Sequence, residues 1–281
     1  MSMGNGTGTV PAGGARSRRR ASRQRVPVAL LLPACLGLLF LTLPLLGLLL
    51  RTPWTTLPRR LAEPEVLAAL RLSLQSATLA TVVCLVLGVP LAWLLARVEF
   101  RGRRLVRALV TVPLVLPPVV GGVALLLVFG RQGLVGGWLD STFGITLPFT
   151  TAGVVVAEAF VAMPFLIIAV EGALRGADSR YEEAAATLGA GRWTTFTHVT
   201  LPLVAPGVAA GALLCWARAL GEFGATITFA GNYPGTTQTM PLAVYLALET
   251  DLDAAIVLSL ILLTVSVVIL AGLRDRWITT R

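Results

Sequence analysis

Ionisable side chains within long apolar segments are the residues of this chain best suited to chemistry. Arg218 and Glu222 stand four residues apart, a spacing that would place both on one face of a helix. Charges in apolar surroundings are costly and usually face protein or water. Two interpretations stay open, and they are compatible: an ion pair that offsets the burial of both charges, or a polar lining in which Arg218 draws an anion. Glu158 and Glu171 stand 13 residues apart in another apolar segment, so they need not share a face or a depth.

Patterns for other chemistry are missing from the sequence. There is no G-x-x-x-x-G-K-[ST] phosphate-binding loop. The single histidine, His198, has no cysteine or carboxylate cluster beside it, so we expect no catalytic centre, no metal site and no cofactor. The three cysteines fall within apolar segments and predict no disulfide framework. The chain is therefore not expected to be an enzyme by itself.

Six apolar segments must position these residues. Hydrophobic residues make up 56% of the 281 residues and charged residues 13%, whereas soluble domains have about 45–50% and about 25%. Each segment is long enough to cross a hydrocarbon core as a helix, which takes roughly 20 residues. We predict an all-α integral membrane protein whose six transmembrane helices form one domain, residues 26–273, with spans at about 26–50, 72–96, 108–130, 149–174, 203–229 and 254–273. Prolines at 113, 117 and 118 indicate a kink or an irregularity in the third span.

The distribution of arginine predicts the orientation of these spans. All 23 basic residues are arginines. With a cytoplasmic N-terminus, 17 of them fall on the cytoplasmic side, five fall on the outer side, and Arg218 lies within a span. This asymmetry follows the positive-inside rule and places both termini in the cytoplasm of a multi-pass protein of the cell membrane. It also accounts for the net charge of +9 without a nucleic-acid partner, which would need a folded basic face.

The two ends of the chain are short and basic. Residues 1–25 are rich in Gly, Ser and Arg and are expected to form a disordered cytoplasmic tail. The apolar run that follows is too long for the core of a signal peptide, so we expect it to be retained as the first span. Residues 274–281 are expected to form a short cytoplasmic C-terminus.

The segment 175–202, between two apolar segments, is predicted to form a helix, a bend and a second helix. Ser179 and Glu182 have capping-box spacing, with Asp178 as a rival cap. Gly189 suits a helix stop because glycine adopts a left-handed backbone without steric penalty. A second short helix is expected from Arg192, with Pro202 setting the entry to the next span. This is the shape of a docking element.

The spacing in this segment resembles the EAA loop of ABC-importer permeases, in which Glu-Ala-Ala is followed by three residues, Gly, nine residues, Ile, any residue and Leu-Pro. Valine replaces the isoleucine here. The residues that we assign to this ATPase-coupling loop are Glu183, Ala184, Ala185, Gly189, Arg192, Val199, Leu201 and Pro202.

Further motifs extend the resemblance over about residues 26–273. GVPLAWLLAR at Gly88–Arg97 looks like the family's second helix, and TVPLVLPPVVGG at Thr111–Gly122 is similar to its third. RALGEFGATITFAGNYPGTTQTMPLAVY at Arg218–Tyr245 resembles molybdate permeases in particular. Sulfate permeases share the GEFG part, and tungstate differs little from molybdate in size and charge, so both oxyanions remain alternatives. A rival of another class is an ion-coupled secondary transporter, which often has an internal repeat with broken helices; no convincing repeat is present.

The resemblance implies a six-span permease subunit of a type I ABC importer that carries molybdate inward. It also implies a homodimer with the pathway on its two-fold axis, surrounded by membrane lipid. Two copies of a separate cytosolic ATPase would bind the two EAA loops, and an extracytoplasmic binding protein would deliver the oxyanion. ATP hydrolysis would then take place on the partner subunit, and Arg218 and Glu222 would be candidates for the translocation path.

Overall fold

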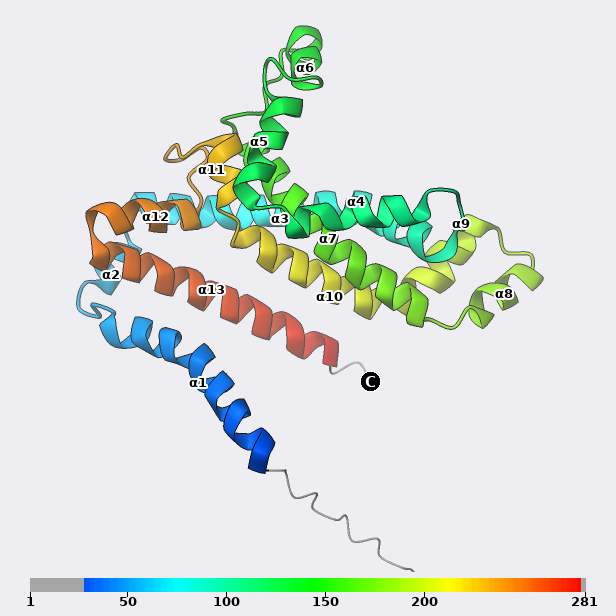
Figure 1. Ribbon diagram of the computed structural model, residues 1–281, viewed down its shortest axis with the longest axis horizontal. Coiled ribbons are helices and arrows are strands. Elements are labelled where there is room, and N and C mark those ends of the chain that lie inside the picture. The colour runs from blue at the N-terminus through cyan, green and yellow to red at the C-terminus, as the bar shows by residue number, and fades with distance from the viewer. Residues whose placement is uncertain (1–27, 279–281) are drawn as a thin grey trace, which may run out of the picture. The chain divides into compact units, whose positions relative to one another are not determined.

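The computed structural model describes residues 28–278, and these form helices joined by turns, with no strand. The chain divides into two compact units, residues 1–47 and residues 48–281. The predicted tail, 1–25, lies outside the described residues, and α1 (Val28–Arg51) begins just after it. The second unit contains the other helices (Figure 1), which are α2 (Leu57–Leu61), α3 (Pro64–Arg97), α4 (Arg103–Val115), α5 (Pro118–Phe129), α6 (Gly136–Phe143), α7 (Thr151–Gly176), α8 (Arg180–Thr187), α9 (Arg192–Thr195), the π-helix η1 (Phe196–Thr200), α10 (Leu201–Leu220), α11 (Gly224–Ala230), α12 (Met240–Thr250) and α13 (Leu252–Ile278).

Five stretches of helix are long and apolar enough to cross a membrane, and a sixth is obtained if α4 and α5 are counted as one bent span. The predicted all-α class is confirmed. In the described part of the chain the five stretches are Leu30–Arg51, Pro64–Arg97, Thr151–Gly176, Arg192–Leu220 and Leu252–Ile269.

The third predicted span, 108–130, is not one helix. The structure breaks it into α4 and α5, whose axes differ by 118°, and Figure 1 shows α5 turning away from the direction of α4. Pro117 and Pro118 cause the break, because proline has no backbone N–H and its ring clashes with the preceding turn. Pro118 instead begins α5, where a missing N–H leaves no hydrogen bond unmade. The prolines indicated a kink or an irregularity, and the structure shows a sharp bend of the span.

The fifth predicted span, 203–229, is also interrupted. Helix α10 ends at Leu220, and α11 begins at Gly224 after a three-residue break. The carboxylate of Glu222 accepts a hydrogen bond from the backbone N–H of Ala225, at 2.8 Å. This bond satisfies one of the free amides of the new helix end, as a capping residue does. The spacing of Arg218 and Glu222 suggested that both lie on one helix. This expectation was wrong, because Glu222 lies in the break after α10.

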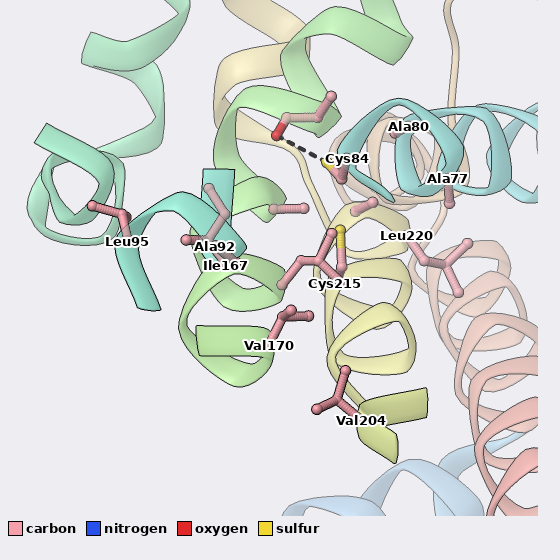
Figure 2. Packing of buried hydrophobic residues seen from close by; sticks show 14 of the residues in the cluster. Ala77, Ala80, Cys84, Ala92, Leu95, Ile167, Val170, Val204, Cys215 and Leu220 are labelled. Atoms are coloured by element: carbon pink, nitrogen blue, oxygen red, sulfur yellow. Dashed lines mark hydrogen bonds between the residues drawn. The ribbon is translucent and has the colours of Figure 1, made fainter. Parts of the chain in front are cut away.

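The core of the second unit lies where α3, α7 and α10 pack together. Its buried residues are mostly small, and on α3 they recur at Ala77, Ala80 and Cys84, which is helical spacing. Cys215 on α10 lies in the same cluster (Figure 2). Small side chains let helix backbones approach closely, which is how membrane helices gain packing energy without a hydrophobic driving force. The cysteines Cys84 and Cys215 are free thiols in this core, as the sequence indicated.

Helices α5 and α11 are held together by a glycine contact. A Cβ atom on Gly122 would lie 2.6 Å from the Cβ of Thr228 and 2.9 Å from the carbonyl oxygen of Ala225. Both distances are too short for any side chain, so only glycine fits there. The broken third span is thereby anchored to the helix that follows Glu222.

Candidate functional site

The loop between α7 and α10 contains the predicted helix and bend. Helix α8 ends in a left-handed residue, Gly189, with a φ of +83°. The backbone N–H of Gly189 donates to Ala186 at 3.0 Å, and that of Ala190 donates to Ala185 at 3.0 Å. This pair of bonds is the Schellman arrangement that ends a helix at glycine. The predicted helix stop at Gly189 is confirmed.

The second helix of the loop differs from the prediction. It begins at Arg192, as expected, but does not end before the next span. Helix α9, the π-helix η1 and α10 run on as one helical stretch from Arg192 to Leu220. Pro202 does not interrupt it, because it sits in the first turn of α10, where the preceding π-helical turn accommodates its missing N–H. From Arg192 onward, the loop is therefore helically continuous with α10.

The start of α8 also differs from the prediction, because the capping box of Ser179 and Glu182 is not formed. The Ser179 hydroxyl donates to the Glu183 carboxylate at 3.2 Å and makes no cap bond. Asp178, the rival cap, accepts the backbone N–H of Arg180 at 3.0 Å. Glu182 instead accepts hydrogen bonds from Arg97 on α3 and from Thr200 at the end of η1.

The predicted loop residues divide by exposure. Glu183, Ala184, Gly189, Arg192 and Pro202 are exposed, and the other three are partly covered: Ala185, Val199 and Leu201.

Three large side chains beside these residues are also exposed, and the motif did not select them. They are Tyr181 at 60%, Leu188 at 87% and Trp193 at 75% of their full accessible surface. Leu188 and Trp193 flank the bend, so the loop presents an apolar tip between charged residues. Exposed apolar patches rimmed by polar residues mark interaction sites. The signal in the sequence was two large apolar residues on either side of a glycine turn in a polar loop.

Glu182 connects α8 to α3. Its Oε1 accepts a hydrogen bond from Arg97 Nη2 at 3.1 Å and another from the Thr200 hydroxyl at 2.9 Å. Beside them is a cavity of about 430 Å³, lined by residues that include Arg192. No sequence pattern joins Arg97 to Glu182, which lie 85 residues apart.

The structure brings Arg218 and Glu222 together. Arg218 Nη1 lies 2.7 Å from Glu222 Oε2, and the side chains are 27% and 1% exposed. The ion pair is therefore formed in the structure. Because Arg218 is only partly covered, the arginine also offers positive charge beyond the pair.

A second carboxylate is buried on α7. Glu158 on α7 is 1% exposed, and its Oε1 accepts a hydrogen bond from the Ser76 hydroxyl of α3 at 2.8 Å. Its Oε2 has no hydrogen-bond partner among the described residues.

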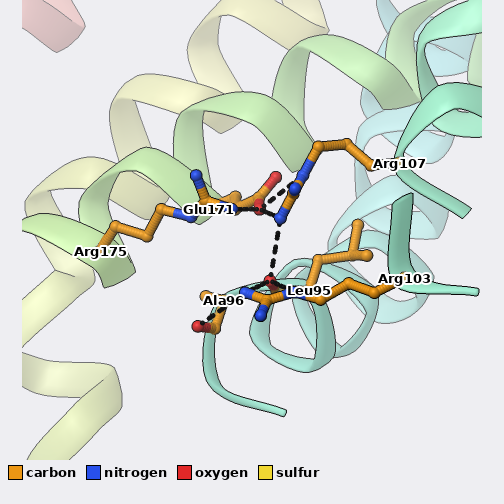
Figure 3. A network of polar contacts seen from close by, with 6 residues as sticks. All are labelled: Leu95, Ala96, Arg103, Arg107, Glu171 and Arg175. Atoms are coloured by element: carbon orange, nitrogen blue, oxygen red, sulfur yellow. Dashed lines mark hydrogen bonds and ion pairs between the residues drawn. The ribbon is translucent and has the colours of Figure 1, made fainter. Parts of the chain in front are cut away.

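Glu171 lies within five residues of the end of α7 and is at the centre of an arginine network (Figure 3). Its carboxylate accepts hydrogen bonds from Arg107 Nε and Nη2, at 3.1 and 2.7 Å, and pairs with Arg175 at 2.7 Å. Arg103 donates to the carbonyl oxygen of Leu95 in the last turn of α3. The network joins α3, α4 and α7. The sequence showed Glu171 alone, because its partner on α4 lies 64 residues away.

Metal ligation finds no support in the described part of the chain, where no group of three or more His, Cys, Asp or Glu side chains is placed to hold an ion. His198 is exposed, and its Nδ1 lies 2.8 Å from the Thr197 hydroxyl.

Comparison with known proteins identifies similar chains. Residues 88–280 match the family described as "Binding-protein-dependent transport system inner membrane component". The chain is 49% identical over 245 residues to the molybdenum transport system permease protein ModB of Mycobacterium tuberculosis, covering 87% of this chain and 92% of the relative. It is 43% identical to ModB of Escherichia coli, covering 78% and 95%. The sulfate transport system permease protein CysT of Escherichia coli is 38% identical, covering 85% and 87%.

Solved structures share the fold at lower sequence identity. A bacterial ABC transporter involved in the import of the acidic polysaccharide alginate superimposes with a TM-score of 0.74 at 19% identity, over 90% of this chain and 95% of that one. The MetNI methionine ABC transporter, in an inward-facing conformation, gives 0.57 at 19% identity, over 75% and 92%.

Proposed function

Because the chain belongs to the family of binding-protein-dependent transport system inner membrane components, we propose that it is the membrane-spanning subunit of an ATP-driven importer of molybdate. The observation that carries this proposal is the 49% identity, over 87% of the chain, to a molybdenum transport permease. The sulfate permease at 38% identity makes sulfate the second candidate substrate. Tungstate is the third, because its size and charge are close to those of molybdate. Family membership argues against the ion-coupled secondary transporter.

Coupling to ATP rests on the exposed loop. The apolar tip at Leu188 and Trp193, the exposed Glu183 and the Gly189 bend together form a surface suited to an ATPase subunit. Since the helix that starts at Arg192 continues into α10, a displacement of the loop would be carried directly into a span. The chain itself would contribute no ATP chemistry, which is assigned to the separate ATPase.

Assembly as a homodimer, with two ATPase copies and an extracytoplasmic molybdate-binding protein, completes the proposal. The loop would then face the cytoplasm, together with both termini, as the arginine distribution predicts. ATP binding would bring the two loops together and shift the spans between inward-open and outward-open states. Both partners would act by biasing this two-state equilibrium.

Transport across the membrane would use the polar groups of α10 and its break. Arg218 lies within the fifth apolar segment and is partly exposed, so it is the proposed attraction point for the oxyanion, and its ion pair with Glu222 holds it in place. The ion pair alone also accounts for both residues, and removal of both charges at once separates the two roles.

The test is uptake into proteoliposomes that contain the complex of this chain, its ATPase and its binding protein. Molybdate uptake should require ATP, and vesicles loaded with ADP are the matched control. Tungstate and sulfate are added as competitors to rank the three anions. Uptake that proceeds equally well with ADP would refute the ATP-driven importer, and sulfate outcompeting molybdate would refute the substrate.

A further inference from the structure

The side of α8 opposite its exposed residues is tied to another span. Glu182 Oε1 accepts hydrogen bonds from Arg97, the last residue of α3, and from Thr200, the last residue of η1. The side chains of Arg97 and Glu182 are only 18% and 21% exposed, and Thr200 is buried. Hydrogen bonds between charged groups are the stronger kind, and partial burial protects them from screening by salt.

A second contact joins the same elements. Trp93 lies one turn before Arg97 on α3, and its ring meets that of Phe196 on η1 edge to face, with centroids 6.0 Å apart. Such aromatic pairs stabilise a contact beyond the area they bury. The end of α3 therefore touches both α8 and η1 through one polar and one aromatic contact.

These contacts matter because α3 has no short chain connection to the loop. Along the chain, α8 is joined to α7 by residues 177–179 and to α9 by residues 188–191. A displaced α8 would thus move α7 and α10 through the backbone. Helix α3 would follow through side-chain contacts, and the triad of Arg97, Glu182 and Thr200 is the polar contact that joins its end to α8 itself.

We propose that Arg97, Glu182 and Thr200 form a latch that makes α3 move together with α8 when the ATPase displaces the loop. The inference rests on the proposed function, since it assumes that a partner moves α8. Arg97 and Thr200 are positioning residues, which act by fixing the carboxylate of Glu182. The latch spreads the motion of one short helix over three spans: α3, α7 and the α10 stretch.

The first test measures anion imported per ATP hydrolysed by the assembled complex in proteoliposomes. Arg97→Ala and Glu182→Ala should each lower this ratio about tenfold, which corresponds to ~1.4 kcal/mol of lost coupling. The exchange Arg97→Glu with Glu182→Arg should restore most of it, because the opposite charges still meet and a threonine hydroxyl can also accept a hydrogen bond. Glu99→Gln is the matched control: this carboxylate lines the same cavity and makes no ion pair among the described residues.

Two milder variants keep the test decisive if the alanine variants fail to assemble. Arg97→Lys retains a donor and should lose less than Arg97→Ala, whereas Thr200→Val removes one hydrogen bond at nearly constant volume. A wild-type ratio in Arg97→Ala or Thr200→Val would overturn the latch. An exchange variant no better than the single variants would also overturn it, since the two charges would then act separately.

A second readout does not depend on the transported anion. Spin labels at Thr187 and Glu99, in a variant without the native cysteines, report the distance between α8 and the end of α3. This distance should stay constant when ATP binds to the wild-type complex and should change when Glu182→Ala is present. A distance that changes equally with and without Glu182 refutes the latch. If the wild-type complex fails to take up molybdate but the distance between α8 and the end of α3 stays constant on ATP binding, only the proposed substrate is refuted.

Discussion

Removal of one partner of the Arg218–Glu222 pair should destabilise the protein more than removal of both. In Arg218→Met, the Glu222 carboxylate is left 1% exposed with the Ala225 N–H as its partner. Breaking a buried ion pair in this way costs about 3–5 kcal/mol. Since the Arg218 side chain is 27% exposed and not fully buried, we expect the loss of unfolding free energy to lie near the lower limit.

The double variant should join Arg218→Met with Glu222→Gln. Glutamine removes the negative charge but keeps an oxygen to accept the Ala225 N–H, which leucine would leave without a partner. We expect the double variant to regain about 2 kcal/mol relative to Arg218→Met, as a double-mutant cycle for two residues in contact would show. Arg175→Met is the matched control: its partner, Glu171, retains Arg107.

The assay has two parts. Equilibrium unfolding in mixed micelles gives the stability of each variant, and uptake is then measured per complex that co-purifies with the ATPase. An Arg218→Met protein as stable as the double variant would refute the reasoning about the ion pair. If the double variant assembles but imports poorly, Arg218 attracts the anion. Full uptake by the double variant refutes that role and leaves the pair as a purely structural feature.

Three further outcomes are expected. The Gly189→Val protein should insert normally, but its complex should hydrolyse ATP without uptake. A Cβ at this position meets no atom within 4 Å, so the cost is the strain of the left-handed backbone, about 1–2 kcal/mol, which misaligns α8. Normal uptake at normal expression would contradict this. The cysteine of Thr187→Cys should not react with impermeant thiol reagents added outside intact cells. Labelling at this position would show that the loop lies outside the cell and would refute the predicted orientation. The pKa of Asp251 is held below its ordinary value of 3.8, first by the hydrogen bond from the Ala254 backbone N–H and second by that from Arg60. Asp251→Asn should therefore lower the free energy of unfolding by its full amount above about pH 3.8, and this loss should disappear as the pH falls further. Unfolding measured against pH checks this, and a loss that stays constant with pH would contradict it.

The helical character of the chain could be predicted from the sequence because hydrocarbon leaves the backbone no other hydrogen-bond partner. Apolar runs of about 20 residues therefore predict helices whatever their neighbours are. The stop at Gly189 could be predicted for a similar reason, since a left-handed residue depends on the absence of a Cβ and on nothing distant in the chain. Both are local properties, and local properties can be read along the sequence.

The breaks in two spans were only partly predictable. Pro117 and Pro118 indicated a disturbance, but a kink and a 118° turn use the same residues. The size of the turn depends on where α5 finds a surface, and the contact of Gly122 with α11 provides one. The break after Leu220 had a weaker signal, because Glu222 caps α11 only once that helix has separated from α10.

The partners of the charged residues were decided by the tertiary structure alone. Ser179 and Glu182 have the spacing of a capping box, yet Glu182 pairs with Arg97 and Thr200 because a charged donor and a buried hydroxyl outcompete a backbone amide exposed to solvent. Glu171 likewise meets Arg107 from 64 residues away. Local spacing states which bonds are possible within one helix, whereas packing brings distant donors within reach and selects the bonds that form.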